Sequence, residues 1–171
     1  HGLDPKTDIG PVINARQLAD VEARVAEAVA DGARVLTGGK RSRRFPNGFF
    51  FEPTILVDVR PEMRIVATET FGPTMPIMKV RGIEQAIAMA NAQEYGLGAN
   101  IYTNNMEWAM TAMERITAGT FWINDPLTDN EAGPFGGMKK TGHSRELGVE
   151  GLDEFRETKH VHLDWKQEVK P

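Results

Sequence analysis

The sequence of 171 residues contains no cysteine. Disulfide bonds and thiolate metal sites are therefore excluded within these residues, and so is a cysteine nucleophile. The sequence also contains neither a G-x-G-x-x-G motif nor a Walker motif. The sequence therefore offers neither standard phosphate-binding loop in support of a nucleotide site.

Long apolar runs and an excess of basic residues are absent as well. No apolar run is long enough to cross a bilayer and no signal-peptide pattern is present, so we expect no membrane partner and a cytoplasmic location. The formal net charge is −4 and no basic stripe dominates, which argues against a nucleic-acid partner.

Length and composition favour one domain. With 40% hydrophobic residues, a chain of this length can bury one substantial core. The first residue is His1 rather than methionine, so we expect a processed or truncated piece of a longer chain.

A helix is predicted near the start of the chain. Asn14 is typical of a helix N-cap with Gln17 as its capping-box partner, and Asp31-Gly32 predicts the helix end. Between these positions, apolar residues at three- and four-residue steps form one stripe: Leu18, Val21, Val25 and Val29.

Several β-rich segments follow. Residues 34–36 form a short strand candidate, and Pro53 indicates that residues 49–51 and 54–59 are edge strands or the arms of a hairpin.

The middle of the chain then predicts the order strand, helix, strand, helix, strand. The segments are residues 75–80, 83–91, 99–103, a helix capped by Asn105, and 120–123. Such a βαβαβ order gives a parallel sheet covered by helices, which places the chain in the α/β fold class.

The last third of the chain changes character. Residues 124–148 are rich in glycine and too irregular for a long helix or strand, and a loop of this length is usually functional or disordered. In residues 158–165, Val161, Leu163 and Trp165 alternate with polar residues, which predicts a half-buried strand. Its free edge can pair with another domain or another subunit.

The segment Thr-Glu-Thr-Phe-Gly-Pro, residues 68–73, is a candidate binding loop. The carboxylate of Glu69 can accept two hydrogen bonds at once, which suits the vicinal hydroxyls of a ribose. The ring of Phe71 can flank a flat heterocycle, and Gly72-Pro73 fixes the chain direction beyond it. An ordinary loop leading into a strand has the same pattern, so both interpretations stay open.

Three other groups of residues have two interpretations each. His160 and His162 are either solvated strand residues or two metal ligands that lack a third, and we predict no metal site. Ser144 beside His143 does not make a catalytic dyad by adjacency alone, and Arg145 is expected to anchor loop backbone or form an ion pair. The basic residues 40–44 form either a solvated loop or a phosphate site.

Six motifs in order give the whole chain a resemblance to the C-terminal part of the aldehyde dehydrogenase superfamily. They are the turn at residues 4–11; Pro53-Thr54-Ile55-Leu56; Glu69-Thr70-Phe71-Gly72-Pro73; Asn91 with Tyr95-Gly96-Leu97; Gly119 through Asn124; and the blocks at residues 134–139 and 142–148. Thr68, Thr141 and Ser144 depart from the family pattern, and the last two affect loop rigidity more than chemistry.

The resemblance implies a fold and a division of labour. It implies a three-layer, Rossmann-like parallel sheet flanked by helices, with residues 1–157 as part of the catalytic domain. Residues 158–171 would form the oligomerisation strand and tail of a homodimer or homotetramer. The cofactor domain and the nucleophilic cysteine would lie outside these residues, so the fragment alone is expected to be inactive.

The resemblance also implies an activity and site residues. The family oxidises an aldehyde with NAD or NADP through a cysteine thiohemiacetal and a thioester. Glu69 and Phe71 match the cofactor-binding positions, the first on the nicotinamide ribose and the second near the nicotinamide ring. Phe135, Leu127 and Asp129 match the substrate channel, and no catalytic residue falls in this chain. A non-catalytic, self-associating α/β fragment and a CoA-acylating relative remain the alternatives.

Overall fold

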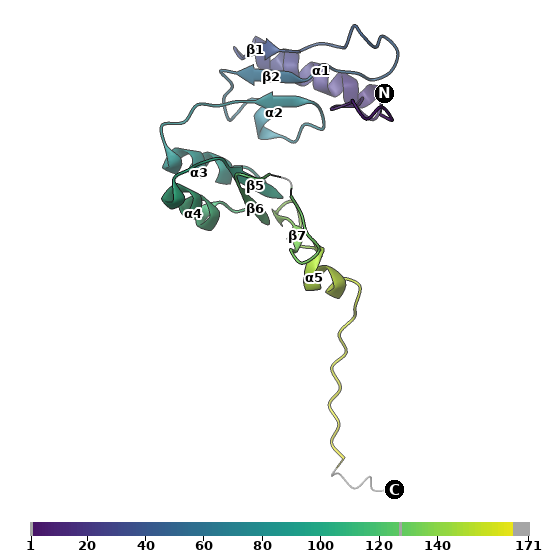
Figure 1. Ribbon diagram of the computed structural model, residues 1–171, viewed down its shortest axis with the longest axis vertical. Helices are drawn as coiled ribbons and strands as arrows, with labels where there is room; N and C mark the ends of the chain where they lie inside the picture. The colour runs from purple at the N-terminus through teal and green to yellow at the C-terminus, as the bar shows by residue number, and fades with distance from the viewer. Residues whose placement is uncertain (1, 127, 166–171) are drawn as a thin grey trace. The chain divides into compact units, whose positions relative to one another are not determined.

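The computed structural model describes residues 2–126 and 128–165 of the chain (Figure 1). The described residues form two compact units, which meet in the sequence between Gly82 and Ile83. A cluster of buried hydrophobic side chains lies in the first unit, among residues 18–65. Composition predicts one core for the whole chain, whereas all residues of this cluster belong to the first unit.

The first unit is built around one long helix and a three-stranded sheet. Its elements are α1 (Ala15–Ala30), β1 (Arg34–Thr37), β2 (Thr54–Val57), α2 (Arg64–Ala67) and β3 (Thr74–Pro76). The Asn14 side chain accepts a hydrogen bond from the backbone N–H of Gln17 at 2.9 Å and so caps α1, as predicted. At the other end, Gly32 has φ +101°, the left-handed conformation that ends helices, so this prediction is confirmed too.

The sequence predicts residues 54–59 as an edge strand or a hairpin arm; strand β2 lies in the centre of the first sheet, so the edge-strand alternative is wrong. It pairs antiparallel with β1 and parallel with β3. Pro53 precedes the strand, so its missing N–H removes no ladder hydrogen bond. Leu56 of this strand is fully buried against the α1 stripe, together with Val21, which explains why β2 takes the central place.

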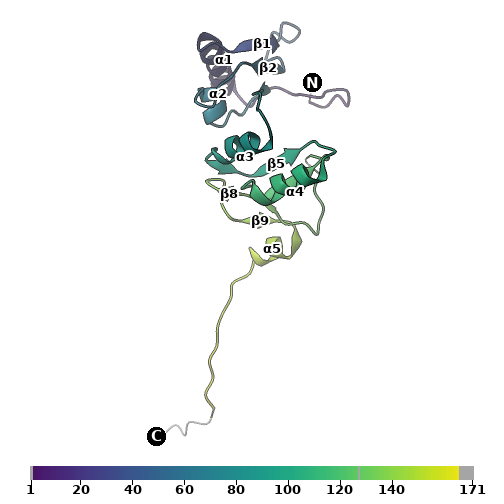
Figure 2. The same cartoon turned by 90° about the vertical axis from the view of Figure 1, so that its left-hand side faces the viewer.

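The second unit contains two helices, a parallel strand pair and several two-residue strands. Its elements are α3 (Ile83–Asn91), β4 (Tyr95–Gly96), β5 (Gly98–Ile101), α4 (Met106–Arg115), β6 (Thr120–Ile123), β7 (Phe135–Gly136), β8 (Met138–Lys139), β9 (Arg145–Glu146) and α5 (Gly148–Asp153). Strands β5 and β6 are parallel and α4 connects them, which confirms the predicted β-α-β crossover. Figure 2 shows α3, α4 and this strand pair packed together.

The α/β class is confirmed, but one predicted pairing is not observed. The strand expected at residues 75–80 is the shorter β3, and it pairs with β2 rather than with β5. The backbone N–H of Ile77 also donates to the carbonyl of Leu56. The edge of β2 that β1 leaves open is thus occupied by β3, within the first unit.

The end of the described chain is extended. Residues 158–165 form no strand with any other described residue, and Figures 1 and 2 draw them as an extended segment. The alternating apolar side chains of this segment are largely exposed, at 73%, 78% and 79% for Val161, Leu163 and Trp165. The strand prediction is therefore left untested by the contacts of one chain. None of the described helices has the length and apolar character needed to cross a membrane.

Candidate functional site

The loop at residues 68–73 connects α2 to β3 and is shaped by short-range hydrogen bonds. The Thr68 hydroxyl donates to the carbonyl of Arg64 at 2.9 Å and closes the end of α2. The N–H of Gly72 then donates to the Thr70 carbonyl at 2.9 Å, and the N–H of Thr74 donates to the Gly72 carbonyl at 2.8 Å. The first of these tight turns is centred on Phe71 and the second on Pro73, so they fix the backbone at Phe71 and just after it.

Gly72 brings the loop into direct contact with α1. A Cβ atom at this position would overlap the Val21 side chain, which is fully buried. Only glycine lets the backbone approach the helix this closely. The glycine of the Glu-x-Phe-Gly-Pro motif is therefore explained by packing, and it sets the height of Phe71 above the helix.

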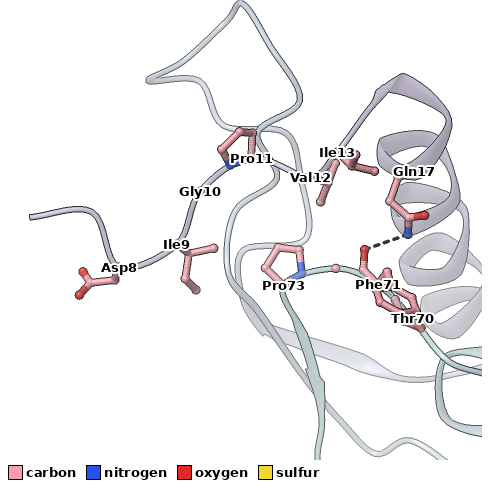
Figure 3. A pocket seen from close by; sticks show the side chains of 11 residues that line it. Asp8, Ile9, Gly10, Pro11, Val12, Ile13, Gln17, Thr70, Phe71 and Pro73 are labelled. Atoms are coloured by element: carbon pink, nitrogen blue, oxygen red, sulfur yellow. Dashed lines mark hydrogen bonds between the residues drawn. The ribbon is translucent and has the colours of Figure 1, made fainter. Parts of the chain in front are cut away.

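Gln17 holds the same loop from the start of α1. Its side-chain Nε2 donates to the Phe71 carbonyl at 2.8 Å, as Figure 3 shows. This corrects the capping-box prediction in part: Asn14 caps the Gln17 N–H, but the Gln17 amide bonds the distant loop instead of returning to Asn14. Residues 54 positions apart are joined by this bond, and local sequence patterns do not encode such a contact.

An open groove of about 650 Å³ lies beside the loop, within the first unit (Figure 3). It is lined mainly by apolar residues and glycine, with Asp8, Gln17 and Thr70 as the polar exceptions. The lining residues are Asp8, Ile9, Gly10, Pro11, Val12, Ile13, Gln17, Thr70, Phe71, Gly72 and Pro73. A flat, partly apolar ligand group fits such a surface.

The chemistry of the loop fits a nucleoside ligand. The Phe71 side chain is 70% exposed, so one ring face is available to a flat heterocycle. Glu69 is exposed two residues earlier, and its carboxylate can accept hydrogen bonds from two neighbouring hydroxyls. The structure thus places both predicted cofactor-binding residues on one short, fixed loop.

Arg24, a buried residue of α1, also contacts the loop, and it was not predicted from the sequence. Arg24 of α1 is 9% exposed, and its Nη1 donates to the Thr68 hydroxyl at 2.6 Å and to the Thr70 hydroxyl at 3.3 Å. Its Nε donates to the Asp20 carboxylate at 2.6 Å, and Arg64 of α2 bonds the other Asp20 oxygen at 2.6 Å. The signal that could have found it is the position of Arg24 inside the apolar stripe, three residues after Val21.

The two arginines lower the pKa of Asp20 below its ordinary value of 3.8, chiefly through the hydrogen bond from Arg24. The folded-state pKa therefore lies below the unfolded-state pKa. The resulting stability is fully present above about pH 4 and is lost as the pH falls through the folded-state value.

We expect Asp20→Asn to lower the free energy of unfolding by about 1–2 kcal/mol at pH 7, because Arg24 would lose its charged partner while buried. The difference from wild type should narrow steadily below about pH 4, where Asp20 of the wild type becomes protonated. Melting temperatures recorded from pH 3 to pH 7 measure this. Asp58→Asn is the control, since the exposed Arg34–Asp58 pair contributes little. A pH-independent difference would contradict the assignment.

The predicted substrate-channel residues belong to the second unit. Phe135 is half-buried and begins β7, where it pairs with Glu146 of β9. Asp129 is exposed in the preceding loop, and Leu127 lies outside the described residues. The loop is anchored by the Trp122 indole N–H, which donates to the Thr128 carbonyl at 2.9 Å. A channel role for these three residues stays a prediction.

The glycine-rich blocks of the second unit are held by side chains that bond backbone. Arg145 Nη1 donates to the carbonyls of Gly137, His143 and Ser144, which confirms its expected role as a loop anchor. Thr141, one of the departures from the family pattern, accepts a hydrogen bond from the Gly96 N–H at 3.0 Å. This departure therefore ties the block to β4.

Two further motifs interlock in the same unit. Lys139 Nζ donates to the carbonyls of Asn91 and Gln93, both at 3.0 Å. The Asn91 amide donates to the Arg115 carbonyl and accepts from the Thr117 N–H. The motif formed by Asn91 with Tyr95-Gly96-Leu97 and the block at residues 134–139 thus support each other, and their mutual contacts account for both without a ligand.

The basic segment, His143 with Ser144, and the possible metal ligands are the remaining candidates. Arg41 of the basic segment makes two hydrogen bonds to Glu22, at 2.6 and 2.8 Å, as a surface ion pair does. His143 and Ser144 are both exposed. Among residues 2–126 and 128–165, no three His, Cys, Asp or Glu side chains gather in a metal-binding arrangement.

Comparison with known proteins identifies the family that this chain resembles. The model of the aldehyde dehydrogenase family matches residues 1–161. A succinate-semialdehyde dehydrogenase [NADP(+)] of Deinococcus radiodurans is 39% identical over 158 residues, 92% of this chain and 33% of the relative. A betaine aldehyde dehydrogenase of Bacillus subtilis is 39% identical over 168 residues, 97% of this chain and 34% of the relative.

Solved structures agree. The lactaldehyde dehydrogenase of Escherichia coli matches with a TM-score of 0.88 and 40% identity, over 95% of this chain and 34% of that one. A point mutant of the Staphylococcus aureus betaine aldehyde dehydrogenase, in complex with NAD⁺, matches with a TM-score of 0.91 and 35% identity, over 99% of this chain and 35% of that one. The chain therefore spans about a third of the length of the relatives it matches.

Proposed function

The chain belongs to the aldehyde dehydrogenase family, and we propose that it forms part of a longer NAD(P)-dependent enzyme that oxidises an aldehyde to a carboxylic acid. The observation that carries this proposal is the loop at residues 68–73, which presents Glu69 and Phe71 together beside an open groove. When bound, the nicotinamide cofactor accepts a hydride from the substrate.

The role of this chain is to orient that cofactor. Glu69 accepts hydrogen bonds from the two hydroxyls of the nicotinamide ribose, and Phe71 packs near the nicotinamide ring. Gln17 and Gly72 keep the loop backbone in place, through the hydrogen bond to Phe71 and the contact with Val21. A nicotinamide held by Phe71 near its ring and by Glu69 at its ribose samples fewer unproductive orientations. Positioning of this kind raises the rate of hydride transfer.

The chemistry at the substrate belongs to residues outside this chain. A cysteine thiolate adds to the aldehyde carbon, and the adduct loses a hydride to become a thioester. Water then releases the carboxylic acid and regenerates the thiol. The net reaction consumes one aldehyde, one water and one oxidised cofactor, and it yields one acid, one reduced cofactor and a proton. Phe135, Leu127 and Asp129 line the path of the substrate.

An activity assay of the full-length enzyme tests this proposal. Small aliphatic and aromatic aldehydes are supplied with NAD⁺ or NADP⁺, and reduction of the nicotinamide is followed by absorbance. We expect turnover with at least one aldehyde and none from the 171-residue chain alone, because that chain has no cysteine. Absence of turnover with every aldehyde and both cofactors would overturn the proposal.

A cytoplasmic location stays a prediction.

We also propose that the enzyme is a homo-oligomer, a dimer or tetramer, held in part by residues 158–165. The support is the alternation of exposed apolar and polar side chains along an extended segment. Such a segment gains main-chain hydrogen bonds and buries one face when it joins the sheet of another subunit.

Leu163→Lys is expected to weaken this association about tenfold or more, because a charge would replace an apolar side chain on the paired face. His162→Lys, on the opposite face of the segment, is the control and should leave the mass unchanged. Light scattering over a dilution series measures both. Equal masses for the two variants at every concentration would contradict the role of this segment.

A further inference from the structure

The part of the loop that carries Glu69 is fixed by one buried guanidinium. Arg24 contacts the residues on both sides of Glu69, bonding the hydroxyls of Thr68 at 2.6 Å and Thr70 at 3.3 Å. The same nitrogen lies 3.4 Å from the Thr68 carbonyl oxygen. Because Arg24 is 9% exposed, water competes little for these contacts.

These contacts decide where the Glu69 side chain points. Thr68 has extended backbone, with φ −127° and ψ 151°. Arg24 bonds the hydroxyls of both Thr68 and Thr70, so these two side chains face α1, and Glu69 between them is exposed. Because neighbouring side chains in extended backbone point to opposite sides, these contacts favour a Glu69 carboxylate directed away from the helix.

The guanidinium is itself held in one orientation. Asp20, one helical turn earlier, bonds Arg24 Nε at 2.6 Å, and Arg64 of α2 bonds the second Asp20 oxygen at 2.6 Å. The planar guanidinium therefore uses one edge on Asp20 and another on the loop. A lysine, with a single charged nitrogen, cannot make both sets of contacts in this geometry.

We propose that Arg24 is a positioning residue for hydride transfer, acting through the Glu69 carboxylate by fixing the backbone on either side of it. The inference rests on the proposed cofactor role of Glu69. It assigns to the buried side of the loop a function beyond packing: Arg24 sets the direction from which Glu69 reaches the ribose.

A double-mutant cycle in the full-length enzyme tests this, with single-turnover formation of NAD(P)H as the readout. Arg24→Met keeps the apolar stem and removes the guanidinium. We expect it to slow hydride transfer about tenfold, since small misplacements of reacting groups carry such costs. In the Glu69→Gln background the same substitution should change the rate less than about twofold, because both changes act on one interaction.

Three further variants separate positioning from general damage. Arg41→Met removes another ion pair of α1, the one with Glu22, and should leave hydride transfer within about twofold of wild type. Arg24→Lys should recover only part of the rate. Thr68→Val keeps the shape of the side chain and removes the shorter Arg24 contact together with the hydrogen bond from Thr68 to the Arg64 carbonyl. It provides the test if Arg24→Met does not fold, with the same loss of effect expected in the Glu69→Gln background.

The outcomes separate this inference from the proposed function. Equal slowing by Arg24→Met, or by Thr68→Val in its place, with and without Glu69→Gln would overturn the positioning role and leave the function of Glu69 intact. An unchanged rate for these variants beside a slow Glu69→Gln enzyme would do the same. If Glu69→Gln itself transfers hydride at the wild-type rate, the proposed cofactor role fails, and the inference fails with it.

Discussion

The full-length enzyme carrying Glu69→Gln is expected to transfer hydride about 10- to 100-fold more slowly than wild type, a larger change than that in its affinity for the cofactor. The substitution keeps the size of the side chain but replaces a doubly accepting carboxylate with a neutral amide. Hydrogen bonds to a charged acceptor are about twice as strong as neutral ones, so the ribose would be held less firmly.

Stopped-flow absorbance in a single turnover measures the hydride-transfer rate, and an equilibrium titration measures the dissociation constant of the cofactor. Glu62→Gln is the matched control, because Glu62 is exposed and its ion pair is with the nearby, also exposed Arg60. An affinity loss as large as the rate loss would mean that Glu69 binds the cofactor without orienting it.

Gly119→Ala is expected to destabilise the second unit by about 3 kcal/mol, a large share of the stability of a typical domain. A Cβ atom on Gly119 would overlap the carbonyl oxygen of Gly136 and come within 2.9 Å of Gly137 Cα. Both obstacles are backbone atoms, so no side chain can turn aside to make room. The N–H of Gly119 also donates to the Gly96 carbonyl, and a shift would strain this bond.

Thermal unfolding of the full-length enzyme measures the effect as a melting temperature lowered by about 5–10 °C. Gly82→Ala is the control, because a Cβ atom there meets nothing within 4 Å. If both variants melted at the wild-type temperature, the close approach of residues 119 and 136 would not exist in the folded enzyme.

The longer helices α1, α3 and α4 could be predicted well from this sequence because their signals are local. The cap at Asn14 and the glycine after α1 lie within a few residues of the ends they determine. The same is true of α4, where the Asn105 side chain accepts from the Trp108 N–H at 3.1 Å. Periodicity between such caps marks the buried face without knowledge of the partner.

Strand partners could not be predicted in the same way. An apolar strand such as β2 has two edges, and the sequence does not state which segments will bond them. The choice of β3 over a segment of the second unit depends on a parallel pairing between residues about twenty positions apart, Thr54 with Thr74 for example. Pro53 misled because its effect depends on whether it lies within the strand or just before it.

In the candidate site, too, residues of a contiguous motif could be predicted and residues that contact it only through the fold could not. Glu69 and Phe71 are identifiable because their chemistry is carried by a contiguous motif, and the structure leaves both exposed. Gln17 and Arg24 act on this loop from more than 40 positions away, through contacts that only the fold creates. A charged residue in an apolar stripe is the one local sign of such a role.

A structure of the full-length enzyme with bound NAD⁺ or NADP⁺ would show whether Glu69 holds the nicotinamide ribose. We predict a Glu69 carboxylate oxygen within about 3.2 Å of a ribose hydroxyl, with the Phe71 ring beside the nicotinamide. A ribose bound entirely by other residues, with Glu69 facing solvent, would contradict it.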